Sequence, residues 1–128
     1  MFKDHIQRIR DGVGNVYNLE NLAAWIQKYI HLEGKLMSMS GPYSFQAAIV
    51  NDTARVTNTV KCAQIGLTTA TIAYFLAGMA TQKKFNVIYA LPTASDAGKL
   101  TTTKLNPLVY GSKDLMYLLD KNVDSSEL

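Results

Sequence analysis

Apolar residues recur at helical spacing in the first third of the chain. The positions that carry this spacing are Leu19, Leu22, Ala23, Ile26, Tyr29 and Ile30. Because they lie three or four residues apart, they predict a helix with Asn18 as its N-cap and Gly34 as its stop. A second helix is predicted after Ser40, since Pro42 suits a first turn and the apolar positions up to Asp52 have a period near four.

Two segments in the middle of the chain have the pattern of strands. Residues 55–62 are rich in β-branched side chains, which favour a strand over a helix. Residues 86–91 (NVIYAL) form a nearly continuous apolar run closed by Pro92, which is typical of a strand buried on both faces of a parallel sheet. Residues 69–80, between the two, contain no charged side chain and predict a helix buried on several sides.

Two further helices are predicted after the second strand. The first begins at a cap provided by Thr93 or Ser95 and extends to about Lys104, ahead of the pair Asn106-Pro107. The second covers residues 112–119 and is amphipathic, with a polar tail after it.

The order strand, loop, helix, strand, helix predicts an α/β protein whose two strands lie parallel, joined by a right-handed crossover. Common doubly wound domains have five or six strands, so the chain looks like half of such a domain. Unpaired strand edges and uncovered apolar surface are sites of association. The chain is therefore expected either to self-associate through this sheet or to stay soluble only with a partner.

Composition limits the class of protein. The 128 residues suffice for one domain, and 48% hydrophobic against 18% charged residues indicates a globular chain. A net charge of +3 is small for a protein whose whole surface grips DNA. Local DNA contact by lysines remains an alternative to a simple solvated surface; the candidates are Lys83, Lys84, Lys99 and Lys104.

The cysteine content and the N-terminal sequence indicate a cytoplasmic protein without a membrane partner. Cys62 is the one cysteine, so an internal disulfide is excluded, and a buried small hydrophobe is its expected role. The charged N-terminus lacks the apolar run of a signal peptide, and the apolar stretch at 70–80 is about half of the ~20 residues that span a bilayer. His5 and His31 lack partners at metal-binding spacing.

The segment 61–69 (KCAQIGLTT) lies where a phosphate-binding loop belongs, between the first predicted strand and the uncharged helix. Such a loop directs backbone N–H groups and the positive helix end at phosphates, and it places a hydroxyl such as that of Thr68 on magnesium. The pattern G-x-x-x-x-G-K-[ST] is partly met, because Gly66 is followed by Leu67 and the leading glycine is absent. An exposed strand-end lysine at Lys61 and a simple N-cap at Thr68 or Thr69 are the structural alternatives.

The loop KCAQIGLTT, followed by a buried helix and VIYALPTASDAGKLTTTKLNPLV, resembles the large subunit of tailed-phage DNA-packaging terminases, lambda-type branch. In that branch the loop is similar to K-x-A-[RQ]-x-G-[YLF]-[ST], with the phosphate-facing lysine at its front. The matching positions are Lys61, Gly66, Thr68, Pro92, Thr93, Asp96 and Lys104. The resemblance covers roughly residues 19–128.

This resemblance implies a partial P-loop NTPase fold, with parallel strands and flanking helices, preceded by an N-terminal helical segment. The implied division is a helical segment and linker over 1–40 and an incomplete ATPase domain over 41–128. The implied cofactors are ATP and Mg²⁺, the metal being held with the nucleotide at Thr68. The implied nucleotide-binding residues are Lys61, Cys62, Ala63, Gln64, Ile65, Gly66, Leu67, Thr68 and Thr69, with Tyr43, Phe45 and Gln46 at the adenine.

By the same resemblance the chain is the N-terminal ATP-binding portion of a motor that packages double-stranded DNA into capsids. Double-stranded DNA, the terminase small subunit and the portal are its implied partners. The acidic pair that the family needs for hydrolysis is not found in the sequence, so turnover by the chain alone is expected near background. The alternative is a non-catalytic interaction module that binds a motor, portal or capsid partner, and a helicase-like ATPase portion is a third reading.

Overall fold

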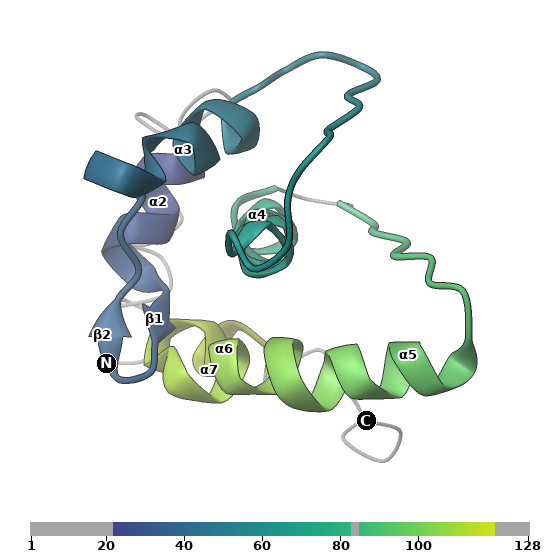
Figure 1. Ribbon diagram of the computed structural model, residues 1–128. Coiled ribbons are helices and arrows are strands. Elements are labelled where there is room, and N and C mark those ends of the chain that lie inside the picture. Colours follow the sequence, from purple (N-terminus) through teal and green to yellow (C-terminus); the bar gives the residue numbers. More distant parts are fainter. Residues whose placement is uncertain (1–21, 83–84, 120–128) are drawn as a thin grey trace.

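The computed structural model describes residues 22–82 and 85–119, which form a mostly helical structure with one small antiparallel sheet. In chain order the elements are α2 (Leu22–Tyr29), β1 (His31–Leu32), β2 (Lys35–Leu36), the 3-10 turn η2 (Gly41–Tyr43), α3 (Ser44–Val50), α4 (Leu67–Thr81), α5 (Ala94–Leu100), the π-helical η3 (Thr101–Leu105), α6 (Asn106–Gly111) and α7 (Lys113–Leu119). Helix α4 lies between the α2 and α3 layer and the long row formed by α5, η3 and α6 (Figure 1).

A β-hairpin follows α2, where the sequence predicts a longer helix. Helix α2 ends at Tyr29, and β1 pairs with β2 so that His31 faces Leu36. Glu33 and Gly34 turn the chain with φ values of 52° and 79°, the left-handed pair that a two-residue hairpin requires. Gly34 is thus a turn residue, and the prediction that it stops the helix is wrong. The predicted N-cap at Asn18 lies outside the described residues.

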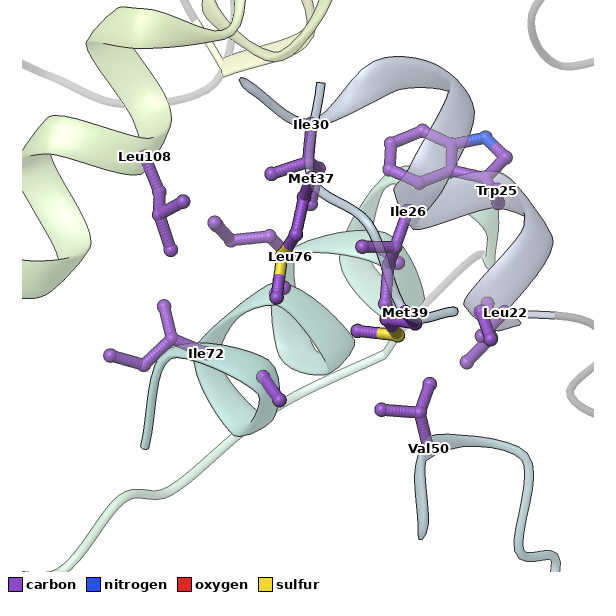
Figure 2. Packing of buried hydrophobic residues seen from close by; sticks show 14 of the residues in the cluster. Leu22, Trp25, Ile26, Ile30, Met37, Met39, Val50, Ile72, Leu76 and Leu108 are labelled. Carbon is purple, nitrogen blue, oxygen red and sulfur yellow. The ribbon is translucent and has the colours of Figure 1, made fainter. Parts of the chain in front are cut away.

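One apolar core holds the helices together. Its members are Leu22, Ala23, Trp25, Ile26, Ile30, Met37, Met39, Val50, Ala70, Ile72, Ala73, Leu76, Ala77, Leu108 and Leu115. Met37 and Met39 both point into it, while Ser38 and Ser40 between and after them are exposed, as the period of two in an extended chain requires (Figure 2). The uncharged helix predicted over 69–80 is confirmed as α4, which is buried along most of its length. Both parts of the proposed division, before and after residue 40, contribute to this core.

The two predicted strands are extended segments without pairing. Neither 55–62 nor 86–91 is a strand, and none of the backbone hydrogen bonds between described segments uses them (Figure 1). Residues 52–64 are all exposed, and Ile88, predicted to be buried, is 93% exposed. A strand is held by a neighbouring backbone, and the described part of the chain offers these segments none. The predictions of strands over 55–62 and 86–91 are therefore wrong, although both segments follow an extended path (Figure 1).

The helix predicted from Thr93 does not end near Lys104. Thr93 is its cap, as expected, since its Oγ1 accepts a hydrogen bond of 3.1 Å from the backbone N–H of Asp96. Pro107 has no N–H and its ring crowds the carbonyl four residues earlier, which would break a regular helix. The chain adopts a π-helical turn instead, in which the Asn106 N–H bonds to the Thr101 carbonyl, and it continues as α6.

The helix predicted over 112–119 is confirmed as α7, and Ser112, the residue ahead of it, binds the first strand of the hairpin. Ser112 is fully buried, and its Oγ accepts a hydrogen bond of 2.9 Å from the backbone N–H of His31. Its carbonyl accepts the N–H of Leu115, which begins α7. No helix in the described ranges combines the length and the apolar character that crossing a bilayer requires.

Candidate functional site

The backbone of the loop before α4 has two left-handed residues. Gln64 has a φ of 59° and Gly66, the N-cap of the 15-residue α4, has a φ of 74°. A left-handed conformation is uncommon for a residue with a side chain and costs about 1–2 kcal/mol. Gly66 is followed by Leu67, which is already in the right-handed helix. A left-handed residue next to a right-handed one turns successive N–H groups toward one side, which forms an anion-binding concavity.

The N-terminus of α4 adds further donors to this loop. The first helical hydrogen bond runs from the Ala70 N–H to the Gly66 carbonyl at 3.0 Å. The N–H groups of Leu67, Thr68 and Thr69 therefore have no partner within the helix. Together with the positive end of the helix dipole, they favour a negatively charged ligand at this point.

Gln46 on α3 contacts the loop directly. Its Nε2 donates a hydrogen bond of 3.0 Å to the Ile65 carbonyl, and the side chain is only 4% exposed. A Cβ added to Gly66 would lie 2.9 Å from the same nitrogen, so the glycine makes room for the amide. Of the three residues predicted at the adenine, Tyr43 and Phe45 are exposed and have no described hydrogen bond to the loop.

The residues at the front of the loop are open to solvent. Lys61 is exposed, and its Nζ lies 3.4 Å from the Cys62 carbonyl, the one hydrogen bond described for this ammonium group. Cys62 is exposed as well, so its predicted burial is wrong: the segment before it does not enter a sheet that would cover it. Ala63 and Gln64 are also exposed, whereas Ile65 is partly covered.

A groove of about 330 Å³ lies between α4 and the extended segment that leads to the loop. Leu67, Ala70 and Tyr74 line one wall, at the spacing of one helix face. Arg55, Thr57 and Thr59 line the opposite wall. They are every second residue of an extended segment, so their side chains point to the same side, and this spacing in the sequence predicts that they lie together. Other lining residues are Ile49, Val50, Asp52, Ala54, Thr71 and Phe75.

No protein-family model matches this chain, and the comparisons with curated proteins and with solved structures gave no match either. The structure brings Gln46, Ile65 and Gly66 together, next to the N-terminus of α4.

The hydroxyl of Thr68 is at the second position of α4 and is partly buried. A single threonine hydroxyl suits a magnesium ion that reaches the site with phosphates, because Mg²⁺ keeps several waters and takes few protein ligands. In the described part of the chain no three His, Cys, Asp or Glu side chains gather where they could hold a metal ion by themselves.

Proposed function

We propose that this chain is the ATP-binding portion of a terminase large subunit of the lambda type, with an incomplete P-loop NTPase fold. The observation that carries the proposal is the backbone of the loop, where left-handed Gln64 and Gly66 lead directly into the free N–H groups of a long uncharged helix. A phosphate group is the kind of ligand that such an arrangement favours, and the resemblance to the family makes it part of a triphosphate.

In this function the loop N–H groups and the Lys61 ammonium contact the phosphates, and Thr68 contacts a magnesium ion held by them. Tyr43 and Phe45 are exposed on the turn and helix that carry Gln46, which leaves their rings available to a base. The intact motor would act on double-stranded DNA, together with a small subunit and a portal. These partners follow from the resemblance to the family.

Replacing Lys61 by alanine is expected to weaken binding of magnesium ATP about 10- to 150-fold, because a charge-assisted hydrogen bond contributes about 1.5–3 kcal/mol. Isothermal calorimetry measures the difference. Lys35→Ala is the matched control, since it removes the same charge from an exposed position on β2. Equal affinity of the wild type and Lys61→Ala would remove Lys61 from the site.

A non-catalytic interaction module is the second candidate function, and the exposure of the extended segments favours it. Val60 is fully exposed, Val56 is three-quarters exposed, and the backbone of their segment is unpaired among the described residues. Exposed apolar side chains on unpaired backbone can add to a sheet in another chain. A second copy of this chain could supply its own extended segments, 55–62 and 86–91, as the pairing strands.

The wild type is therefore expected to self-associate, and its mean mass in multi-angle light scattering should fall on dilution. Changing Val60 and Ile88 to lysine should give a monomer, because charges on a strand edge oppose pairing. Leu36→Lys is the control, since Leu36 is also exposed but lies in the paired hairpin. A wild type that remains a monomer at all concentrations would contradict pairing between copies of this chain.

A further inference from the structure

The hydrogen bond from Gln46 to the Ile65 carbonyl fixes the orientation of the peptide unit between Ile65 and Gly66. All described peptide bonds are trans, and in a planar trans peptide the C=O and the N–H point in opposite directions. The carbonyl of Ile65 and the N–H of Gly66 belong to the same unit. Because the Ile65 carbonyl is bonded to Gln46 Nε2 at 3.0 Å, the Gly66 N–H points away from α3.

That N–H group is available to a ligand. None of the described backbone hydrogen bonds uses the Gly66 N–H, and it precedes the free donors at the start of α4. Without the bond from Gln46 the peptide could rotate, which would turn the carbonyl rather than the N–H toward an approaching anion. A carbonyl oxygen at that place would repel phosphate oxygens.

We propose that Gln46 is a positioning residue, which orients the Ile65–Gly66 peptide so that the Gly66 N–H can bind a phosphate oxygen of the nucleotide. This inference rests on the proposed function and gives Gln46 a role that does not depend on the base. The burial of its side chain supports this role, because the amide lies against Gly66 and its nitrogen is already bonded to the loop. To read adenine through Nε2, the side chain would have to give up or share this bond.

The test compares three ligands in the full chain: magnesium ATP, magnesium GTP and magnesium tripolyphosphate. Gln46→Met keeps the length of the side chain and removes its hydrogen-bond donor. The affinity for all three ligands is expected to fall by the same factor, about 3- to 10-fold, as for loss of one neutral hydrogen bond. A loss confined to ATP would assign Gln46 to the adenine, and no loss for any ligand would exclude a role in the site; either result overturns the inference. A wild type that binds none of the three would instead overturn the proposed function.

Gln27→Met is the matched control for effects on stability. The Gln27 amide also bonds to backbone groups, donating to the Ala23 carbonyl at 3.2 Å and accepting from the Met39 N–H at 3.0 Å. Its loss is expected to lower the melting temperature without changing the affinity for tripolyphosphate. If Gln27→Met weakened binding as much as Gln46→Met, the effect would be one of general stability and the inference would fail.

Gln46→Glu supplies a second variant that depends on the same hydrogen bond. An ionised carboxylate cannot donate to the Ile65 carbonyl, whereas a protonated carboxyl can. The affinity of Gln46→Glu for tripolyphosphate, relative to the wild type at each pH, is therefore expected to recover as the pH falls and the carboxyl is protonated. A constant ratio over the range in which the glutamate titrates would overturn the positioning role.

Discussion

Replacing Gly66 by alanine is expected to weaken binding of magnesium ATP about 30- to 150-fold. The left-handed conformation of Gly66 costs a residue with a Cβ about 1–2 kcal/mol, and the new Cβ would lie 2.9 Å from Gln46 Nε2. In the variant, the loop therefore adopts another conformation that avoids the strain and the collision. Part of the ligand's binding energy is then used to restore the conformation described here, which lowers the affinity. Adding about 1 kcal/mol for the lost hydrogen bond gives the expected range. Calorimetry with magnesium ATP measures it.

Gly34→Ala is the control for this prediction. Gly34 has a φ of 79°, but no atom lies within 4 Å of an added Cβ, so the substitution strains the hairpin without a collision. It is expected to cost about 1–2 kcal/mol of stability and to leave the affinity for ATP unchanged. Wild-type affinity in Gly66→Ala would mean that the loop conformation described here is not the one that binds.

Ile26→Ala is expected to lower the free energy of unfolding by about 2–5 kcal/mol. Ile26 is fully buried in the core on α2, and removal of three carbons there leaves a cavity as well as losing buried apolar surface. Native domains have about 5–15 kcal/mol of stability, so this change removes a large part of it. Urea unfolding followed by circular dichroism gives the value.

Ile88→Ala makes the same chemical change in the segment predicted from sequence to be a buried strand. Because Ile88 is 93% exposed, its loss is expected to alter the free energy of unfolding by less than about 0.5 kcal/mol. A cost for Ile88→Ala close to that for Ile26→Ala would show that 86–91 is buried in solution.

The helices were the most predictable part of this fold, because their signals are local. The uncharged run that became α4, the first turn with Pro42 ahead of α3, and the cap at Thr93 all depend on residues within a few positions of one another. The left-handed conformation of Gly66 has no such local signal, because the residue that caps the start of a helix usually has extended dihedrals.

Features that depend on distant partners were not predictable in this way. Residues 55–62 and 86–91 have strand composition, but a strand exists only where a second backbone meets it, and composition does not say whether one does. The sequence did not predict the hairpin, because Tyr29 and Ile30 continue the helical spacing of α2 up to the first strand of the hairpin. The bond between Gln46 and Ile65 joins residues 19 positions apart, and it is decided by how α3 packs on α4.

The bond between Ser112 and His31 spans 81 positions of the chain, and the core residue Leu115 follows close behind it. During synthesis the apolar faces of α2 and the hairpin are therefore fully covered only after α6 and α7 have been made. Closing so long a loop has an entropic cost that is met only when these late contacts form, which slows folding relative to a helical protein with local contacts. A nascent chain stalled before residue 112 would leave the apolar face of α2 exposed to chaperones after the loop 61–69 has already been synthesised.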